Sequence, residues 1–321
     1  MGLGWIRLDD GSNMRGRRKC RYCGKPAVVW LGYANLGLCA EHYVSYYENK
    51  IRRMLEKHRI RGMLMVAVSG GKDSMALLGT IGRISESLDI DVFAFHINLG
   101  IGEYSEVSEE TVKRFCKDVR VPLIIYDCRK DLGFSIPDIV KRVQRPACSV
   151  CGIVKRWVIN KVAYENGFDF VATGHNIDDA STYILKALMT NDIYSLVRGQ
   201  EEFSESKPEL RLVGRIRPQF YLSERENMLY VQLTNIPIVE DQCPYSRRAT
   251  IHKYKRAWDV LLKINPIAQI NIVRVMKKIR SMMAFPEPKL VQCSVCGFPT
   301  ESEGGVCTFC RLMEMMKNSH N

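Results

Sequence analysis

A short apolar run followed at once by a glycine-rich turn lies in the first quarter of the chain. Residues 63–68 (MLMVAV) have the pattern of a buried strand, residues 69–74 (SGGKDS) follow directly, and helical apolar spacing continues over 75–84. Two glycines let a backbone approach a phosphate closely, and free amides at a helix N-terminus supply partial positive charge. A plain tight turn capped by Asp73 or Ser74 would explain the glycines but not the complete hexapeptide. The segment therefore predicts a phosphate-binding loop, distinct from the GxxxxGK[ST] Walker pattern.

Strands and helices alternate through the middle of the chain. This alternation predicts an α/β fold with a Rossmann-like parallel sheet covered by helices on both faces, and ligands of such sheets bind beyond the carboxyl ends of the strands. Residues 196–285 are less regular, with helical segments at 247–264 and 266–283. Further strands are predicted at 91–97, 122–126 and 169–173, and further helices at 106–119, 151–166 and 178–188.

Seven of the twelve cysteines lie near the two ends of the chain, in patterns typical of metal sites. Thiolates separated by two residues converge on one ion, and a second ligand pair completes a tetrahedron. Four protein ligands leave no open position, so two structural Zn²⁺ sites are predicted. Their ligands are Cys20, Cys23, Cys39 and His42 at one end, and Cys293, Cys296, Cys307 and Cys310 at the other.

Lysine and arginine outnumber aspartate and glutamate by 47 to 35, which gives a net charge of +12. Such an excess favours a polyanionic partner. The basic residues fall in runs beside the first cysteine set and after Cys243, which favours a phosphate-contacting surface over an ordinary solvated face. The runs contain Arg15, Arg17, Arg18, Lys19, Arg21 and Lys25, then Arg52, Arg53, Lys57, Arg59 and Arg61, and finally Arg247, Arg248, Lys253, Lys255 and Arg256.

Composition excludes several classes of protein. With 46% hydrophobic residues the chain is not expected to be disordered, and it contains no apolar run of ~18 residues that would predict a membrane span. Residues 1–12 include Asp9 and Asp10 and no apolar segment, so no secretory signal is predicted. Cysteines that suit metal or redox chemistry rather than disulfides indicate a cytoplasmic location.

Three further cysteines suggest a reactive site. Cys148 and Cys151 lie at the predicted 151–166 helix, Lys155 follows one turn later on the same face, and Cys243 comes late in the chain. Three thiolates are one short of a closed zinc site but can hold a [4Fe–4S] cluster with one iron open. The same residues could instead carry a persulfide and resolve it as a disulfide. The spacing of the cysteines is compatible with both the cluster and the persulfide, and the presence of a third thiol favours the cluster. Cys116 and Cys128 are expected in the core.

Four segments together resemble one known family. The SGGKDS loop is the signature of the PP-loop ATP pyrophosphatases. With GHNIDD at 174–179, RPACSVCGIVKR at 145–156, CPYS at 243–246 and both cysteine modules, the chain resembles the tRNA 2-thiouridine synthetases of the TtuA/NcsA type, relatives of the eukaryotic cytoplasmic tRNA 2-thiolation subunit. The resemblance covers roughly residues 18–312. It implies ATP-dependent adenylation of the C2 oxygen of a tRNA uridine, with Mg²⁺, followed by replacement of that oxygen by sulfur.

The motifs and the resemblance together assign site residues. Lys72 and the loop amides are predicted to bind pyrophosphate. Asp73 and Asp179 are predicted to bind magnesium or to polarise the nucleophilic oxygen. Asp178 is predicted as a helix N-cap, and His175 is expected to shape its loop. The resemblance implies adenine contacts near Ala67 and Ile97 and a [4Fe–4S] cluster on Cys148, Cys151 and Cys243. The predicted ATP-binding residues are Ala67, Ser69, Gly70, Gly71, Lys72, Asp73, Ser74, Ile97, Lys155, Gly174 and Asp179, and the predicted catalytic residues are Cys148, Cys151, Lys155, Asp179 and Asp73.

The resemblance also implies partners and leaves alternatives. tRNA is the expected substrate, and the sulfur donor is expected to be free sulfide or a thiocarboxylated ubiquitin-like protein. A homodimer is common in the family. The target uridine could be the wobble uridine or one in the T-loop. Cytidine 2-thiolation is an alternative reaction. Two other classes of protein are also considered. An amide-forming or lysidine-type ligase would share the SGGKDS loop, but its reaction does not require the three central cysteines. A zinc-ribbon RNA-binding protein without catalysis would account for the two zinc sites, but not for the phosphate loop and Asp179. The expected division is a zinc module at 1–50, a catalytic domain at 51–285 and a zinc ribbon at 286–321.

Overall fold

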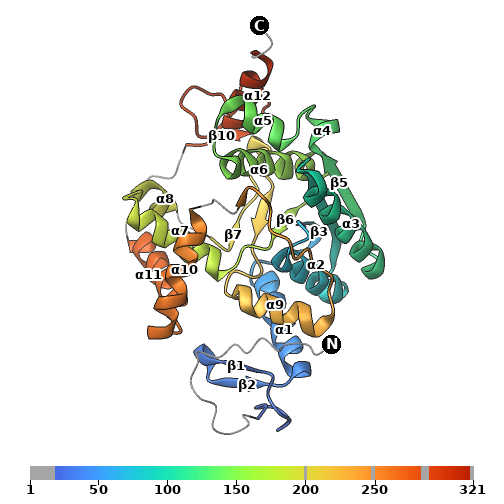
Figure 1. Ribbon diagram of the computed structural model, residues 1–321, viewed down its shortest axis with the longest axis vertical. Coiled ribbons are helices and arrows are strands. Elements are labelled where there is room, and N and C mark those ends of the chain that lie inside the picture. The colour runs from blue at the N-terminus through green and yellow to red at the C-terminus, as the bar shows by residue number, and fades with distance from the viewer. Residues whose placement is uncertain (1–18, 199–200, 247–249, 283–288, 319–321) are drawn as a thin grey trace.

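The computed structural model describes residues 19–198, 201–246, 250–282 and 289–318. Its centre is a six-stranded sheet in the order β5-β4-β3-β6-β8-β7, parallel except where β7 pairs with β8 (Figure 1). The predicted α/β fold with a mainly parallel sheet is confirmed. The strands are β3 (Gly62–Ala67), β4 (Ile90–Asn98), β5 (Leu123–Asp127), β6 (Phe170–Thr173), β7 (Phe203–Ser204) and β8 (Gly214–Ile216).

The strands β7 and β8 have no counterpart in the sequence prediction. They contain two and three residues, which is too short for a period of alternation to show. Because β8 pairs in parallel with β6, the carboxyl end of the sheet extends past β6 on the side away from β3. Side chains of β8 therefore reach the region beside the loop that follows β6.

Helices cover both faces of the sheet, as predicted. One face carries α1, α2, α3, α7 and α9, and the other carries α5, α6 and α12 (Figure 1). Helix α6 begins at Ala147, earlier than the predicted start at Cys151, so both Cys148 and Cys151 lie on it. The helices are α1 (Ala40–Lys57), α2 (Lys72–Ile84), α3 (Gly102–Val119), α4 (Cys128–Asp131), α5 (Ile136–Val143), α6 (Ala147–Glu165), α7 (Ile177–Met189), α8 (Ile193–Arg198), α9 (Glu224–Thr234), α10 (Ile251–Ile264), α11 (Ala268–Met282) and α12 (Thr308–Asn318).

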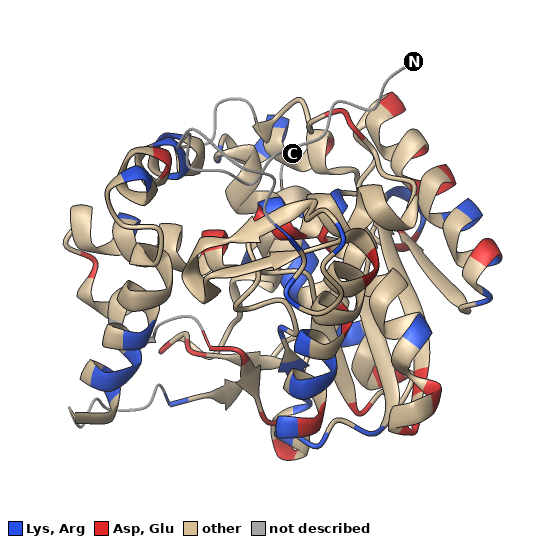
Figure 2. Cartoon of the chain, turned by 90° about the horizontal axis from the view of Figure 1, so that it is seen from below, with Lys and Arg blue, Asp and Glu red and all other residues tan. Residues whose placement is uncertain are grey.

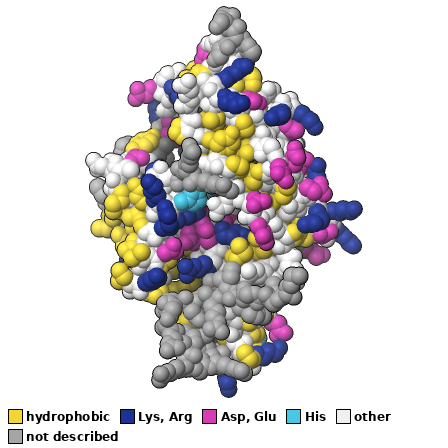
Figure 3. Space-filling model, in the orientation of Figure 1, with side chains coloured by type: hydrophobic (Ala, Val, Ile, Leu, Met, Phe, Trp, Pro, Cys, Tyr) yellow, Lys and Arg dark blue, Asp and Glu magenta, His cyan; other side chains and the backbone are white. Residues whose placement is uncertain are grey.

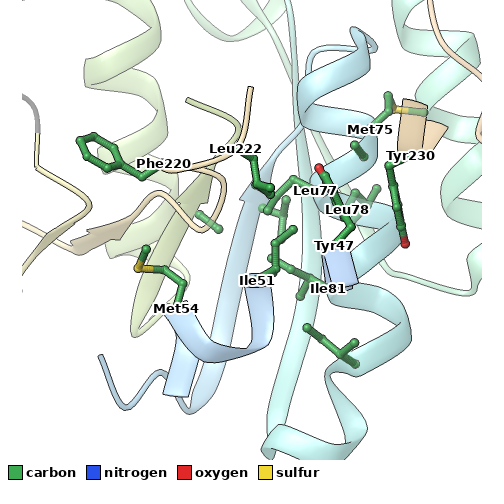
Figure 4. Close-up of a cluster of buried hydrophobic side chains, with 14 of the residues drawn as sticks. Tyr47, Ile51, Met54, Met75, Leu77, Leu78, Ile81, Phe220, Leu222 and Tyr230 are labelled. Atoms are coloured by element: carbon green, nitrogen blue, oxygen red, sulfur yellow. The ribbon is translucent and has the colours of Figure 1, made fainter. Parts of the chain in front are cut away.

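The larger hydrophobic core lies between β3 and helices α1, α2 and α9. The rings of Tyr47 and Tyr230 stack with their centroids 4.1 Å apart, and Ile51 and Leu77 are fully buried beside them (Figure 4). Burying such an aliphatic side chain stabilises the fold by about 1.5–3 kcal/mol. Helix α1 is thereby packed against the helix that follows the phosphate loop.

The two cysteine-rich modules lie at opposite ends of the long axis (Figure 1). The N-terminal module pairs β1 (Val29–Leu31) with β2 (Leu36–Leu38) and leads directly into α1, which runs through residue 50. The C-terminal module consists of β9 (Val291–Gln292), β10 (Pro299–Thr300) and α12. It packs on α6, where Trp157 stacks on Phe309 with centroids 3.8 Å apart. The predicted linker at 286–288 lies outside the described residues. None of the described helices is long and apolar enough to cross a membrane.

Candidate active site

A cavity of about 280 Å³ opens at the carboxyl ends of β3, β4 and β6, next to α6. This is the position at which parallel sheets bind ligands. The structure brings four separate segments together there, and the wall contains these predicted ATP-binding residues: Ala67, Ser69, Asp73, Ser74, Ile97, Lys155, Gly174 and Asp179. Gly70, Gly71 and Lys72 lie in the loop itself, outside the cavity wall.

The loop between β3 and α2 is braced by its own hydroxyl groups. The Ser69 N–H donates to Ser74 Oγ at 3.0 Å, and Ser74 Oγ donates to the Gly71 carbonyl at 3.0 Å. Gly70 has a φ of +85°, which residues with a side chain rarely adopt. Helix α2 follows Gly71, which offers no side-chain cap, so its first amides remain available to an anion. The loop thus has the geometry predicted for phosphate binding.

Gly174 brings the loop after β6 against the phosphate loop. A Cβ at this position would lie 3.0 Å from the Ser74 backbone nitrogen and 3.1 Å from the Asp73 carbonyl carbon. Any side chain would therefore push the two loops apart. His175 is also in the cavity wall, and its Nδ1 lies 3.0 Å from the hydroxyl of Thr173, within its own loop. The close approach places the first turn of α7 beside the cavity.

Alternating charges connect four segments around the cavity. Lys72 Nζ lies 3.0 Å from Asp73 Oδ2 and 3.2 Å from Glu224 Oε2. Lys255 also contacts Glu224, and its Nζ lies 3.0 Å from Asp179 Oδ1. Burial lowers the pKa of both lysines, but the carboxylates outweigh it and raise both. Burial raises the pKa of Asp73. In Glu224 burial acts in the same direction, but the two lysines outweigh it and the pKa falls. Asp73 and Asp179 are in the cavity wall, and the network extends from them to Lys72, Lys255 and Glu224.

Asp178 does not have its predicted role. The N-cap of α7 is Asn176, whose Oδ1 accepts from the Asp179 N–H at 3.1 Å. Asp178 instead accepts from the Glu224 N–H at 2.8 Å and from Gln269 Nε2 at 2.9 Å. The prediction was wrong because the chain is extended at Asn176 and already helical at Asp178. Asp178 therefore ties α7 to α9 and α11, and burial raises its pKa.

The three central cysteines come from two segments that meet at α6. Cys148 Sγ lies 3.8 Å from the Tyr245 carbonyl, which belongs to the segment containing Cys243. Burial raises the pKa of Cys151; the Lys155 charge opposes this, and the charges of Cys243 and Cys148 reinforce it. Cys148 and Cys151 are one turn apart on α6, Lys155 follows Cys151 by one further turn, and the segment with Cys243 contacts the same helix end.

The three central sulfurs are spaced differently from the sulfurs of the two end sets. Within the described part of the chain, only the end sets bring three or more candidate ligand atoms within 4.8 Å of one another. Ligands of a single ion must lie that close, whereas thiolates on different irons of a cluster need not. Tyr104, in the cavity wall, has its pKa raised by burial and then by the charge of Cys243, with a smaller effect of Cys151. The cavity wall therefore includes Tyr104 and Lys155, while the three cysteines lie outside the wall itself.

The N-terminal set has the geometry of a tetrahedral metal site. Cys39 Sγ and Cys20 Sγ lie 3.2 Å and 3.6 Å from His42 Nδ1, and the sulfurs of Cys23 and Cys39 are 3.7 Å apart. A Zn–S bond of about 2.3 Å gives a tetrahedral edge of about 3.8 Å. Burial raises the pKa of Cys20, but backbone N–H groups outweigh it and lower the pKa to about 6. The residues therefore fit a bound Zn²⁺.

The C-terminal set is similarly arranged. The sulfurs of Cys296 and Cys307 are 3.8 Å apart, and backbone N–H groups of Cys307 and Cys310 donate to Cys293 Sγ and Cys307 Sγ at 3.2 Å and 3.3 Å. Burial raises the pKa of Cys293, but these and neighbouring amides outweigh it and lower the pKa to about 6. All four sulfurs lie within 4.8 Å of one another, so this set also fits a metal ion.

The predicted basic runs are only partly free to contact RNA. Lys57 pairs with Glu202 at 2.9 Å and Lys25 with Glu41 at 3.1 Å, and Lys255 belongs to the cavity network. Lys and Arg residues are spread over many helices rather than gathered on one face (Figure 2). An RNA surface made of these runs stays a prediction. Arg15, Arg17, Arg18, Arg247 and Arg248 lie outside the described residues.

Sequence reasoning missed Glu224 and the part that Lys255 plays in the cavity network. A Ser-x-x-Glu capping signature at 223–226 predicts a helix start and could have indicated Glu224, but nothing in the sequence points it toward the phosphate loop. His96 was also missed. It is buried in the cavity wall, its Nδ1 lies 2.9 Å from the Val68 carbonyl, and its Nε2 has no partner among the described residues.

Comparisons with known proteins agree with this geometry. The PP-loop domain family matches residues 44–258, and the N-terminal LIM domain of 2-thiouridine synthetase TtuA matches residues 19–44. The tRNA-5-methyluridine(54) 2-sulfurtransferase of Pyrococcus horikoshii is 33% identical over 93% of this chain and 94% of that protein. The Thermus thermophilus enzyme of the same name is 36% identical over 92% and 91%. The structure of U34-tRNA thiolase NcsA from Methanococcus maripaludis with its [4Fe-4S] cluster has a TM-score of 0.80 and 25% identity, covering 95% of this chain and 97% of that one.

The parallel sheet, the loop after β3 and the cavity at its mouth define a PP-loop nucleotide-binding enzyme. More narrowly, the chain belongs to the TtuA/NcsA-type tRNA 2-thiouridine synthetases, as the resemblance implied.

Proposed function

We propose that this protein is an ATP-dependent tRNA sulfurtransferase that converts a tRNA uridine to 2-thiouridine. One observation carries the proposal: the phosphate loop and helix α6 line a single cavity, and Lys155, an α6 residue in its wall, lies one turn after Cys151. An oxygen activated at the loop is then within reach of sulfur delivered from the α6 side. An amide-forming or lysidine-type ligase would have no use for that side, and an RNA-binding protein without catalysis would have no use for the cavity.

The site residues suit the chemistry that thiolation requires. The C2 oxygen is a poor leaving group until it is bonded to the α-phosphorus of ATP, after which AMP departs when sulfur attacks the carbon. The loop amides and Lys72 bind the pyrophosphate that leaves, and Lys155 offsets charge on the phosphorus. Asp73 and Asp179 hold Mg²⁺, which neutralises the phosphates. Because Lys72 and Lys255 contact these carboxylates here, binding of Mg²⁺ and ATP involves an exchange of charge partners.

Three metal groups complete the enzyme. Zn²⁺ at each end set stabilises its module. Cys148, Cys151 and Cys243 hold a [4Fe–4S] cluster, which supplies an iron with an open position for a sulfur ligand. The wider spacing of these three sulfurs supports a cluster over a single ion, and the cluster-containing NcsA structure supports it over the persulfide route. The zinc module, catalytic domain and zinc ribbon divide the chain near residues 50 and 285.

The target is a uridine at position 54, in the T-loop. The relatives named for position 54 are 33% and 36% identical to this chain, whereas the U34 thiolase NcsA is 25% identical. The sulfur comes from free sulfide or a thiocarboxylated ubiquitin-like protein. Twelve free cysteines suit a cytoplasmic location. Apolar side chains exposed on α10 and α11 support a homodimer: Val260, Ile264, Val275 and Met282.

The decisive experiment is purification without oxygen, followed by iron and zinc analysis, a visible spectrum and a thiolation assay with unmodified tRNA. Cys243→Ser should lose the cluster absorption and the iron while both zinc ions stay. Cys116→Ala, a buried thiol outside these sites, should retain all metals. A colourless protein without iron after reconstitution would contradict the cluster. Full activity of Lys72→Ala or Asp73→Ala would contradict ATP-dependent catalysis. Mass spectrometry mapped by position should find a 2-thiolated uridine, with or without the 5-methyl group, at position 54, and a thiolated cytidine would contradict the assignment.

A further inference from the structure

Two arginines without carboxylate partners lie beside the cavity, one on α6 and one on β8. The guanidinium of Arg156 folds back over Gly152, where a Cβ would lie 3.2 Å from its Nη1. Glycine therefore leaves room for the guanidinium next to Cys151. Arg215 Nη2 donates to the Arg156 carbonyl at 3.5 Å, so this β8 side chain reaches α6. Within the residues that the structure describes, no carboxylate forms an ion pair with either arginine.

A third arginine completes the group, which we call the arginine cluster (Arg156, Arg215 and Arg217). Arg217 Nη1 donates to the Glu201 carbonyl at 2.9 Å, which holds its side chain at the end of β8. Burial and then the charges of Arg217 and Arg215 lower the pKa of His175. Burial and then the charges of Arg217 and Arg156 lower the pKa of Arg215 to about 10. The cluster therefore faces the loop that carries His175 and remains charged at neutral pH.

The chemistry of the cluster points to a phosphate. Guanidinium groups held close together repel one another, and an anion that contacts more than one of them offsets this repulsion. Their planar forks match two oxygens of a phosphate at once. On one face of the molecule, Lys and Arg side chains lie beside a histidine near the centre, with acidic side chains below it (Figure 3).

The position of the cluster favours RNA over ATP as the source of that phosphate. The phosphate loop follows β3, whereas Arg215 and Arg217 lie at β8, and β6 separates the two strands. Arg156 is exposed on the same helix as the thiols and directly follows Lys155 of the cavity wall, which puts it at the rim of the cavity. A base that enters the cavity leaves its backbone phosphate at this rim.

We propose that the arginine cluster binds a backbone phosphate of the RNA substrate next to the nucleotide being modified. This inference rests on the proposed function, because it takes RNA as the substrate. The other source of the same chemistry is the triphosphate of ATP, and the two make opposite predictions for binding.

The test measures binding of unmodified tRNA to the cluster-loaded protein at several salt concentrations, and binding of ATP and pyrophosphate separately. Arg156→Met and Arg215→Met should each weaken tRNA binding about 5- to 20-fold at low salt and lower the slope of log K against log salt by about one. The double variant should bind tRNA only slightly more weakly than either single variant, because both arginines contact the same phosphate. Arg114→Met, an exposed α3 arginine, is the control. Affinity for ATP and pyrophosphate should change less than about two-fold.

Each other outcome overturns the proposal. Unchanged tRNA affinity and salt slope would make the cluster structural, and weaker ATP or pyrophosphate binding would assign it to the nucleotide. If Arg215→Met does not fold, the test relies on Arg156→Met, because Arg156 is exposed. Arg215→Lys is then the second variant, because it keeps the positive charge but loses the planar guanidinium that can contact two phosphate oxygens. Loss of the proposed function is distinguishable, because a wild-type protein that binds tRNA through these arginines but thiolates nothing would refute thiolation and leave the cluster intact.

Discussion

Lys255 Nζ lies 3.0 Å from Asp179 Oδ1, and this contact joins the helix that follows Cys243 to the nucleotide cavity. The same ammonium contacts Glu224, which in turn pairs with Lys72 of the phosphate loop. The position of α10 is therefore coupled to the charges that surround the nucleotide. Because Cys243 lies just before α10, the segment that carries the third thiol is anchored to the phosphate loop through three side chains.

Lys255→Met should destabilise the protein and impair thiolation. Removing the ammonium leaves Asp179 and Glu224 facing each other without the cation between them, so the free energy of unfolding should fall by about 1 kcal/mol and the thiolation rate at least about ten-fold. Denaturant unfolding and single-turnover thiolation measure the two effects. Lys253→Met, on an exposed position of the same helix, is the matched control. Equal behaviour of the two variants would show that the ion pair has no role.

Asn227→Ala should weaken ATP binding through Asp73. Asn227 Nδ2 donates to Asp73 Oδ1 at 2.7 Å, and its Oδ1 accepts from the Tyr47 hydroxyl at 2.7 Å. The substitution removes both bonds, while Tyr47 keeps its bond from Gln219 and Asp73 keeps its ion pair with Lys72. The free energy of unfolding should therefore fall by about 1–3 kcal/mol, and the dissociation constant of ATP should rise several-fold because Asp73 loses the amide that fixes its carboxylate. Calorimetric titration with ATP measures the second effect.

Tyr47→Phe separates stability from nucleotide binding. It removes the hydrogen bond to Asn227 and the one accepted from Gln219 Nε2, at a cost of about 1–3 kcal/mol, but leaves the bond from Asn227 to Asp73 in place. ATP affinity should therefore stay close to that of the unaltered protein. A loss of ATP affinity as large as that of Asn227→Ala would mean that α1 packing, and not the bond to Asp73, positions the loop.

Cys20→Ser and Cys293→Ser should each remove one zinc ion and leave the other. Each variant loses one of four ligands in a closed site, and the two sites lie at opposite ends of the molecule, so their losses should be independent (Figure 1). Metal analysis counts the ions. The Cys20 variant should also loosen the contact of the first module with α9, where the Tyr33 hydroxyl donates to Glu226 at 2.6 Å. Loss of both ions from either variant would contradict two separate structural sites.

The stabilising effect of Glu202 should disappear in acid. Burial raises the pKa of Glu202, but hydrogen bonds from Lys277 and Lys57 outweigh it and lower the pKa to about 2. Because the folded-state pKa is below the unfolded value, the stabilisation is present above about pH 4.5 and is lost as the pH falls toward 2. Glu202→Gln should cost about 2 kcal/mol at pH 7 and progressively less between pH 4.5 and 2. Glu201→Gln, with a half-exposed side chain, is the control, and a cost for Glu202→Gln that does not change with pH would contradict the ion pair.

Local patterns in the sequence were enough for several parts of the molecule. Residues 63–84 form a strand, a phosphate loop and a helix as predicted, because each of these features depends on neighbours in the chain. The two end sets of ligands come together for the same reason, since closely spaced cysteines meet through short turns. Asp178 shows where this reasoning fails: the chain is extended at Asn176, which therefore caps α7, and Asp178 two residues later is already helical and pairs with residues far away in the sequence.

The sequence by itself determined the fold class, the phosphate loop, the two metal sets and the family. Only the tertiary structure decided that Lys255 faces Asp179, that Glu224 joins the phosphate loop, and that Arg156 meets Arg215 beside the thiols. The physical reason is the range of the interactions. Motifs record contacts between residues close in the chain, whereas these pairs are joined by helix and strand packing, and a single lysine or arginine in a sequence carries no sign of the partner that packing will bring to it.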